Sequence, residues 1–395
     1  MRFLHVLPSV DPRYGGPLEG VRSLCLLYRQ FGHDVEVATL DDPEVIRTSS
    51  FPAKVTGLGP GWGVYGYAPR AHHWFQENVH RFDVVVLNTI WQYSTLAAWR
   101  GLSGTKVPYA VFTHGMLDPY FRHQFPLKHG KKCVYWALFL QRIMNGAKTV
   151  FFTAEEEKLL ARKSFRGYRV HETVVPYGSF GPYCDLQAAR AAFLRQWPEL
   201  SEKRLLISMG RLHPKKGLDI LIEAFSKSAA KSQEFQLVIA GPDQDEYRAK
   251  LVALAESLGV AEKITWTGML RGDLKWGALS ASEVFVLPSH QENFGIVVAE
   301  ALSCSLPVIL SNRINIWREV SKHWAGLVDE DSVEGTVSSL QRWMELTPTE
   351  IQALRGRALV CFHRYFNLQK SAARLVESVE NLAAPGRSPV VQTAD

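Results

Sequence analysis

The chain has 395 residues, of which 46% are hydrophobic and 21% are charged, and its formal net charge is +6. This length predicts two domains of ordinary size, and the composition excludes a disordered chain, a collagen and a coiled coil. The modest positive charge suits an anionic small ligand or an anionic membrane surface equally well. The chain lacks the dense clusters of basic residues that a nucleic-acid-binding protein has, so we expect no nucleic-acid partner.

The cysteines and the N-terminus indicate a cellular compartment. Five cysteines are scattered along the chain without a C-x-x-C pair or a metal-ligand spacing, which is typical of reduced thiols in a cytosolic protein. The apolar run at the N-terminus is too short for a signal peptide, and no stretch approaches the roughly 18 apolar residues of a membrane span. We therefore expect a cytoplasmic protein, soluble or held on a membrane surface without crossing it.

The first half of the chain alternates short apolar runs with helical patterns, as parallel sheets covered by helices do. The apolar runs predict buried strands at Phe3–Leu7, His33–Thr39, Val84–Leu87, Tyr109–Thr113 and Thr149–Thr153. Apolar residues at helical spacing predict a helix over Leu18–Phe31 that ends at Gly32.

The second half repeats this pattern. Strands are predicted at Leu205–Met209, Leu237–Ala240, Ile264–Thr267, Val284–Leu287 and Pro307–Leu310, and helices at Gly217–Lys231, Tyr247–Leu258 and Gly295–Ser303. Each half is therefore predicted to be a doubly wound α/β unit of the Rossmann type. Such units bind ligands outside the carboxyl ends of their strands.

Turn-forming residues gather over Val174–Pro182 and indicate a domain boundary there. We expect an N-terminal domain over residues 1–178 and a C-terminal domain over residues 179–383. The last helical pattern, Leu368–Leu382, is a candidate to cross back to the first domain. Residues 384–395 are predicted to be a flexible tail.

Two polar segments of the first half follow predicted strands. Asp11–Pro17 contains Gly15 and Gly16, and paired glycines let a backbone approach a ligand closely or adopt positive φ. Thr113–Asp118 places His114 at the ligand-binding edge of the sheet. Taken alone, the glycine pair is more typical of an ordinary turn, and the histidine of a satisfied, partly buried side chain.

Ser208–Asp219 runs from a predicted strand through a turn with two glycines and a proline into a helix. Arg211 and Lys216 bracket this turn, where a guanidinium fork and an ammonium point charge suit a diphosphate. Fixed cations of this kind neutralise a leaving diphosphate without a metal ion. The alternative interpretation is a solvated basic turn.

Leu287–Leu302 carries two carboxylates, Glu292 in a turn and Glu300 inside the following helix, with seven residues between them. The N–H groups of residues 294–296 would face an anion, as those of helix starts do. Carboxylates accept hydrogen bonds from hydroxyl groups, so the pair suits a ligand with a polyol on each side of a phosphate. Taken alone, it is equally a surface acid and a helix-face acid. All four segments, however, follow predicted strands, which favours a ligand site.

Together these segments resemble the retaining glycosyltransferases of family four, which have the GT-B fold of two Rossmann-like domains facing each other across a cleft. The resemblance covers nearly the whole chain and is most specific over Gly210–Gly217 and Ser289–Ile309. Tyr177-Gly178 and Ser305 depart from the family's usual Asn-Gly and Gly. The resemblance implies catalytic roles for His114, Arg211, Lys216 and Glu292. It implies donor binding by Gly15, Gly16, Arg211, Lys216, Gly241, Met269, Glu292, Asn293, Phe294, Gly295, Ile296 and Glu300.

The resemblance also implies the chemistry. Glu292 would contact hydroxyls of the donor sugar, Glu300 the ribose, and the two cations the diphosphate of a nucleotide-diphosphate sugar, with no metal and no further cofactor. A glycan or lipid-linked acceptor is expected, in polysaccharide or lipid-linked oligosaccharide biosynthesis. The alternatives are a nucleotide-sugar epimerase, a phosphorylase-like enzyme, or a non-catalytic protein that binds a sugar nucleotide.

Three patterns imitate other sites. Gly61–Gly66 spells G-x-G-x-x-G, but no convincing strand precedes it and no acid follows at the expected distance, so we expect no dinucleotide site. Asp243-Gln-Asp245 imitates a D-x-D metal site and is better explained as a solvated loop. His123 and His129 lack a third ligand with suitable spacing.

Phe121–Met144 joins a basic, aromatic lead to the apolar run Val134–Leu140. One interpretation is a buried helix behind a solvated loop. The other is a surface that docks on anionic lipid, with Lys128, Lys131 and Lys132 facing the headgroups. Loops over residues 40–71 and 90–100, rich in Gly, Trp and Tyr, are expected to face the acceptor.

Overall fold

The computed structural model of the protein describes residues 1–11, 14–46, 51–120, 122, 126–175, 177–243 and 246–383, without the side chain of Lys231. The chain divides into two compact units, one of Met1–Pro176 with Ser371–Asp395 and one of Tyr177–Lys370. This division lies two residues before the boundary that the turn-forming residues indicate. The expected tail at residues 384–395 lies outside the described residues.

The first unit is built on a sheet of seven parallel strands in the order β3-β2-β1-β4-β5-β6-β7. The four central strands are buried apolar runs, so helices must cover both faces of the sheet. The strand bounds are β1 (Arg2–Val6), β2 (Asp34–Thr39), β3 (Lys54–Gly57), β4 (Val84–Asn88), β5 (Tyr109–Phe112), β6 (Thr149–Phe152) and β7 (Glu172–Val174).

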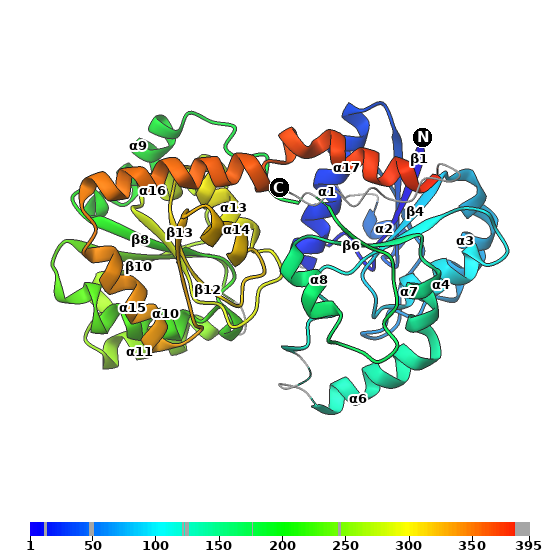
Figure 1. The fold of residues 1–395 in the computed structure, drawn as a ribbon, viewed down its shortest axis with the longest axis horizontal. Coiled ribbons are helices and arrows are strands. Elements are labelled where there is room, and N and C mark those ends of the chain that lie inside the picture. The colour runs from blue at the N-terminus through cyan, green and yellow to red at the C-terminus, as the bar shows by residue number, and fades with distance from the viewer. Residues whose placement is uncertain are drawn as a thin grey trace. The chain divides into compact units, whose positions relative to one another are not determined.

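The helices of the first unit connect successive strands (Figure 1). Helix α1 buries Leu18, Val21, Leu24 and Tyr28 at helical spacing against the sheet, and its chain leaves through Gly32 at φ 76°. The helices are α1 (Gly16–Gln30), α2 (Pro43–Ile46), α3 (Pro69–Asn78), η2 (Val79–Arg81), α4 (Tyr93–Leu102), α6 (Pro126–Tyr135), η3 (Trp136–Leu140), α7 (Gln141–Gly146) and α8 (Glu155–Ala161). Helix α17 (Leu368–Ala383) joins this unit from Ser371 on, and its Glu380 lies 3.0 Å from His33 after α1.

The second unit has six parallel strands in the order β10-β9-β8-β11-β12-β13. Helices α9, α13 and α16 lie on one side of this sheet and α10, α11 and α15 on the other (Figure 1). The strands are β8 (Arg204–Met209), β9 (Phe235–Ala240), β10 (Ile264–Gly268), β11 (Val284–Leu287), β12 (Val308–Ser311) and β13 (Gly326–Asp329). The α-helices are α9 (Leu186–Gln196), α10 (Leu218–Lys227), α11 (Tyr247–Ser257), α12 (Gly272–Ala281), α13 (Ile296–Ser303), α14 (Trp317–Lys322), α15 (Val333–Met344) and α16 (Pro348–Cys361), with short turns η4 (Pro198–Leu200), η5 (Pro214–Lys216), η6 (Ala229–Lys231), η7 (Ala261–Lys263) and η8 (Phe362–Phe366).

Each unit has its own hydrophobic core, one between residues 4 and 161 and one between residues 206 and 354. Two doubly wound α/β units, one with seven and one with six parallel strands, confirm the predicted fold class. The predicted inner strands agree with the structure to within one or two residues at each end.

The sequence analysis missed three strands, β3, β7 and β13. Two of them, β3 and β7, are edge strands of the first sheet, and β13 is an edge strand of the second. None contains a buried residue, so none has the apolar signature by which the inner strands were recognised. Their pairing with a neighbouring strand, rather than their own sequence, makes them strands.

The two stretches expected to be loops that face the acceptor contain regular structure: residues 40–71 include α2 and β3. Residues 90–100 are not a loop, because Tyr93–Leu102 forms helix α4, most of which is buried. The basic residues before Val134 are also not on a loop: Lys128, Lys131 and Lys132 lie on α6. Trp136 and Leu140, in the π-helical turn η3, are buried, whereas Leu127, Val134 and Leu138 are exposed. The segment is therefore buried on one side only.

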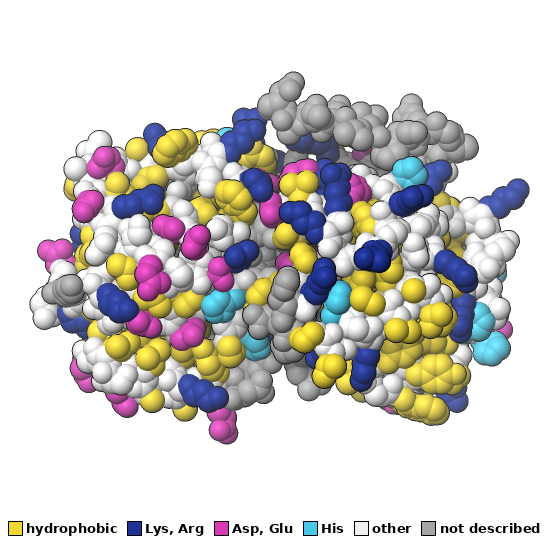
Figure 2. Space-filling view, turned by 60° about the horizontal axis from the view of Figure 1, so that its bottom comes forward, with side chains coloured by type: hydrophobic (Ala, Val, Ile, Leu, Met, Phe, Trp, Pro, Cys, Tyr) yellow, Lys and Arg dark blue, Asp and Glu magenta, His cyan; other side chains and the backbone are white. Residues whose placement is uncertain are grey.

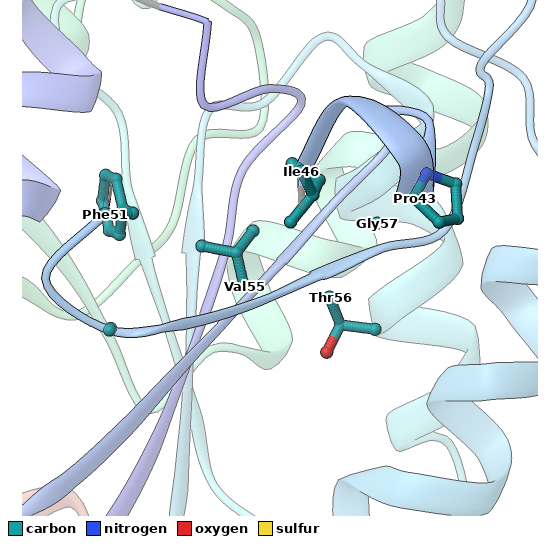
Figure 3. A pocket seen from close by; sticks show the side chains of 7 residues that line it. Pro43, Ile46, Phe51, Val55, Thr56 and Gly57 are labelled. Carbon is teal, nitrogen blue, oxygen red and sulfur yellow. The ribbon is translucent and has the colours of Figure 1, made fainter. Parts of the chain in front are cut away.

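A shallow pocket lies beside the edge strand β3 (Figure 3), lined by Pro43, Ile46, Phe51, Ala53, Val55, Thr56 and Gly57. Ile46 and Val55 lie on the same side of the strand in this view, and the side chain of Thr56 points to the other side. The lining is mostly apolar and lies within residues 40–71, the stretch expected to face the acceptor, but it contains none of the residues assigned to donor binding or catalysis. This pocket is separate from the chemistry described below.

All five cysteines are free thiols, and three of them, Cys25, Cys304 and Cys361, are buried. Within the described ranges, no helix has both the length and the apolar character needed to cross a bilayer. No group of three or more His, Cys, Asp or Glu side chains among the described residues has the geometry of a metal site.

Candidate active site

Lys216 and Glu292 form an ion pair at the carboxyl ends of β8 and β11. The two side chains are 17% and 20% exposed, so the pair is partly shielded from water yet reachable from solvent. Lys215 and Arg211 add positive charge around the same carboxylate. Lys216, Lys215 and Arg211 of one segment therefore surround the carboxylate of Glu292, which belongs to another segment.

These charges determine the ionisation of Glu292. Burial raises the pKa of this carboxyl group, but the positive charges and the hydrogen bond of Lys216, with Lys215 and Arg211, outweigh that effect. The net result is a pKa below the usual value, so Glu292 stays ionised at neutral pH. An ionised carboxylate accepts hydrogen bonds from hydroxyl groups, and the cations beside it attract a phosphate.

The two loops that carry the pair are locked against each other. Gly217, at φ 64°, caps α10, and a Cβ atom there would lie 2.2 Å from the carbonyl oxygen of Pro288 in the other loop. The N–H of His290 donates to the carbonyl of Lys215 at 3.0 Å. The His213 ring accepts from the N–H of Lys215 at 3.1 Å and caps the turn η5. The backbone thus holds Lys216 at a fixed place relative to Glu292.

The glycines at the neighbouring strand ends make a similar contact. A Cβ atom on Gly241 would lie 1.8 Å from the carbonyl oxygen of Gly210, so the turns after β8 and β9 meet backbone to backbone. The N–H of Gly241 donates to the carbonyl of Gly268 at 2.8 Å. Gly210, Arg211 and Lys216 pack closely together at these strand ends and leave no space for a water molecule between them. Met269, next to Gly268, is 54% exposed, which leaves this edge open to a ligand.

The loop from Glu292 to α13 is fixed from the β12 side. The N–H of Glu292 donates to the carbonyl of Arg313 at 3.0 Å, and its own carbonyl accepts from the N–H of Asn315 at 3.1 Å. The Asn315 amide also donates to the side chain of Asn293 at 3.3 Å. Gly295 adopts φ 68° and α13 begins at Ile296, so the first N–H groups of this helix have no intrahelical acceptor.

Phe294 and Tyr177 connect this loop to the start of the second unit. Their rings pack edge to face with centroids 4.9 Å apart, and Phe294 packs in the same way on Phe366 at 5.7 Å. Tyr177 was noted in the sequence only as a departure from the family pattern. In the structure it buries the apolar side of the loop that carries Glu292.

Glu300, which the resemblance assigns to a ribose, forms an ion pair of its own. Its side chain accepts from Lys275 of α12 at 2.7 Å, and the Lys275 ammonium also lies 4.2 Å from the centre of the Trp276 ring. The two carboxylates of the E-x7-E pattern therefore belong to two separate ion pairs. Lys275 was missed because it lies on a different helix, 25 residues away in the sequence.

The candidates of the first unit lie at its own strand ends. Gly15 caps α1 with φ 67°, and among the described residues no atom beyond the chain neighbours and the helix's own backbone lies within 4 Å of a Cβ placed on Gly15 or Gly16. His114 follows β5, stacks on Phe112 at 4.4 Å and 9°, and lies 3.3 Å from the side chain of Asn88. Burial, with a smaller contribution from the nearby His5, lowers the pKa of His114 to about 3, so its imidazole is neutral.

The three sequence patterns that imitate other sites, G-x-G-x-x-G, D-x-D and the histidine pair, differ in part from what the sequence predicted. A strand, β3, does precede Gly61–Gly66, but Trp62 and Tyr67 pair with each other and α3 begins only at Pro69. Asp243 accepts from the N–H of Arg248 at 3.0 Å, and Asp245 lies outside the described residues. His129 stacks on Phe165 at 5.2 Å, and His123 lies outside the described residues.

Comparison with solved structures identifies the fold. Sucrose-phosphate synthase from Thermosynechococcus elongatus is similar with a TM-score of 0.76 and 20% identity, over 96% of this chain and 98% of that one. Anabaena HepE in complex with UDP-glucose is similar with a TM-score of 0.75 and 18% identity, over 96% and 100%. Together with the two parallel-sheet units, these similarities define a protein of the GT-B fold.

Sequence families identify the relatives. Residues 15–178 match the family described as "Glycosyl transferase 4-like domain", and residues 190–355 match "Glycosyl transferases group 1". The chain therefore belongs to the group 1 glycosyltransferases of the GT-B fold. It is 29% identical over 227 residues to the D-inositol 3-phosphate glycosyltransferase of Rhodococcus jostii (strain RHA1), a match to 55% of this chain and 49% of that protein. The match thus spans about half the length of this curated relative.

Proposed function

We propose that the protein transfers a sugar from a nucleotide-diphosphate donor to a hydroxyl group of an acceptor, with retention of the anomeric configuration. The observation that carries the proposal is the meeting of Lys216, Lys215 and Arg211 with the ionised Glu292 at the strand ends of the second unit. Family membership supports sugar transfer, and a protein of the same fold is described in complex with UDP-glucose.

In the proposed complex the diphosphate lies against the cations and the first turn of α13. Lys216 and Arg211 bind the phosphate oxygens, and the N–H groups of residues 294–296 add their partial positive charge. Glu292 accepts hydrogen bonds from sugar hydroxyls while it keeps its contact with Lys216. The pair thus links the leaving group to the transferred sugar.

The proposed reaction breaks the bond between the anomeric carbon and the diphosphate oxygen, whose electron pair leaves with the diphosphate. The acceptor oxygen forms the new bond from the same face of the sugar, and its proton passes to the departing phosphate. Cations already in place stabilise the negative charge that develops on the diphosphate, and they do not need to reorganise. Metal independence and the lack of a further cofactor are part of this proposal.

The resemblance assigns Gly15, Gly16 and His114 to the phosphates and the transferred sugar, and Gly241, Met269 and Glu300 to the nucleotide. We keep these assignments as part of the proposal. Glu300 then shares the ribose hydroxyls with its present partner, Lys275.

The test is a donor screen. The full chain is incubated with UDP-, GDP- and ADP-sugars and a lipid extract, and nucleotide release and glycosylated products are followed by mass spectrometry, with and without a chelator. Proton NMR of the product reads the anomeric configuration. Nucleotide release that needs an acceptor and gives a retained linkage supports the proposal. An inverted linkage, or no release with any donor, contradicts it.

The same experiment separates the alternatives. A new sugar isomer formed from donor alone indicates an epimerase, and consumption of donor with free phosphate indicates a phosphorylase-like enzyme. Saturable binding of a sugar nucleotide without turnover in any acceptor pool indicates a binding protein.

We further propose that the acceptor is a glycan or lipid-linked glycan and that α6 holds the protein on the cytoplasmic face of an anionic membrane. Leu127, Val134 and Leu138 are 88%, 60% and 56% exposed on α6 and η3, and the basic Lys128 and Lys131 are exposed beside them. Helix α6 lies at the lower edge of the first unit in Figure 1, and Figure 2 turns that edge forward, where hydrophobic and Lys or Arg side chains are interspersed. Apolar side chains among lysines are the chemistry that binds an anionic bilayer interface.

Co-sedimentation with liposomes tests the membrane proposal. The protein should bind vesicles that contain phosphatidylglycerol and not vesicles of phosphatidylcholine alone, and K128E/K131E should abolish binding. The matched control is charge reversal of two exposed lysines of the second unit, Lys227 and Lys250. Equal loss in the control, or no binding by the wild type, contradicts a specific surface on α6.

A further inference from the structure

Three neighbouring strands of the first unit place polar side chains in a row. His5 lies on β1, Asn88 is the last residue of β4, and His114 follows β5 by two residues. His5 and Asn88 are fully buried. The Asn88 amide lies between the two rings, 3.1 Å from Nδ1 of His5 and 3.3 Å from Nε2 of His114.

The backbone around Asn88 fixes which way its amide points. Its nitrogen lies 3.1 Å from the carbonyl oxygen of Val86 and 3.4 Å from that of Val6. Carbonyl oxygens only accept, so the NH2 group must face them, and a flipped amide would place three oxygens together. The amide oxygen of Asn88 therefore faces His114.

This orientation determines where the proton of His114 lies. An amide oxygen only accepts, so Nε2 of His114 must carry the hydrogen. A neutral imidazole has one N–H, which leaves Nδ1 with its lone pair. Among the described residues Nδ1 has no hydrogen-bond partner, and His114 is only partly buried, so this nitrogen is available to a ligand.

A buried carboxylate holds the loop that carries His114. One oxygen of Glu157 accepts from the Thr113 hydroxyl at 2.8 Å and the Gly115 N–H at 2.6 Å, the residues on either side of His114. The other oxygen accepts from the N–H and the hydroxyl of Thr153, both at 2.7 Å. His114 has φ 46°, a left-handed conformation that is unfavourable for a histidine and needs such external support.

We infer that Asn88 and Glu157 are positioning residues that present His114 as a neutral Nε2–H tautomer, whose accessible Nδ1 accepts a hydrogen bond from a hydroxyl group of the substrate. Asn88 fixes the position of the proton on the His114 ring, and Glu157 fixes the backbone on either side of His114. The ring stacked on Phe112 is then aimed in one direction only. The identification of that hydroxyl as a sugar hydroxyl rests on the proposed function; the tautomer does not.

The tautomer is measured directly. In the full chain with 15N-labelled histidine, two-bond 1H–15N correlation spectra distinguish protonated from unprotonated ring nitrogens, and the signals of His114 are assigned by their loss in His114→Gln. We expect protonated Nε2 and unprotonated Nδ1 at neutral pH. In Asn88→Leu, which lacks the acceptor, the signals should move towards a mixture of tautomers. A wild-type His114 that is charged or protonated on Nδ1 overturns the inference, even if Asn88→Leu does not fold.

Two substitutions of His114 test the acceptor in kinetics. The side-chain oxygen of His114→Asn can occupy the place of Nδ1, whereas the amide of His114→Gln reaches the place of Nε2. The inference predicts that His114→Gln lowers kcat/KM about tenfold and that His114→Asn retains most of it. The reverse order overturns the acceptor role of Nδ1.

The two proposals fail in different ways. If no sugar nucleotide is turned over but the spectra show the Nε2–H tautomer, the proposed function fails and the positioning by Asn88 stands. If turnover is found and His114 is protonated on Nδ1, the proposed function stands and the inference fails.

Discussion

The side chains at the strand ends are charged in the second unit and neutral in the first. In the second unit, Lys216 and Glu292 are charged, partly exposed and surrounded by further cations. In the first unit, His5 and His114 are neutral, and burial lowers their pKa values to about 4 and about 3. The same α/β architecture thus supports an ionic site in one unit and a neutral hydrogen-bonding site in the other.

The difference shows what each arrangement can do. Charges that pair across two locked loops are already in place for an anion, and each keeps its partner when the anion binds. A buried neutral network cannot rearrange without leaving polar atoms unpaired. It therefore fixes the orientation of its side chains. Substitutions in the second unit should therefore change activity more than stability, and those in the first unit should change stability strongly.

The largest effect is expected from Lys216→Ala. In the proposed mechanism this ammonium stabilises the leaving diphosphate, so we expect its loss to lower kcat about 100- to 1,000-fold while the melting temperature changes little. The control is Lys227→Ala, which removes an exposed lysine paired with Glu223 on the surface of α10. Wild-type turnover in folded Lys216→Ala would remove the diphosphate assignment.

Glu157→Gln should reduce stability next most strongly. The amide replaces one oxygen with an NH2 group that faces the donors held by Glu157, and at least one buried donor loses its acceptor. A loss of about 3 kcal/mol in the free energy of unfolding is expected from urea denaturation. Glu155→Gln, on the exposed side of the same helix, should cost less than about 1 kcal/mol. Similar losses in both variants would contradict the role of the buried carboxylate.

His5 should make the stability depend on pH. Its folded pKa of about 4 lies below the ordinary 6.5, so the unfolded chain takes up a proton between these values and the folded chain does not. Stability is therefore intact above pH 6.5 and falls as the pH drops towards 4, by about 1.4 kcal/mol per pH unit from this group. Urea denaturation across this window should give a shallower slope for His5→Leu than for the wild type. The exposed His73→Gln is the control and should keep the wild-type slope.

Lys275→Met should have the smallest effect. It keeps the length of the side chain but removes the partner of Glu300, and the proposal assigns this carboxylate to the ribose. We expect KM for the donor to rise about threefold with little change in kcat, which corresponds to about 0.6 kcal/mol. A fall in kcat with unchanged KM would place the Lys275–Glu300 pair at the reacting bond instead of the nucleotide.

The inner strands and the site loops could be predicted because their signals are local. β8 and β11 are buried apolar runs, and Arg211, Lys216 and Glu292 lie within a few residues of their ends. The edge strand β13 has no such signal, because its four residues are all half-buried and its strand character depends on pairing with β12.

The supporting residues could not be predicted for a related reason. Glu157 lies 42 and 44 residues from the groups it holds at Gly115 and Thr113, and nothing in its own segment distinguishes it from Glu155 and Glu156 beside it. Asn88 lies 83 residues from His5. Sequence motifs locate the residues that touch a ligand, whereas the partners that orient those residues emerge only from the packed fold.

The contact between Gly241 and Gly210 has a consequence for engineering. Because any side chain at Gly241 would collide with the neighbouring turn, and Gly217 is constrained in the same way by Pro288, the turns after β8, β9 and β11 cannot be exchanged one at a time. Libraries meant to change donor preference should transplant these three turns as a single cassette from one parent. Randomisation should be confined to outward positions such as Met269.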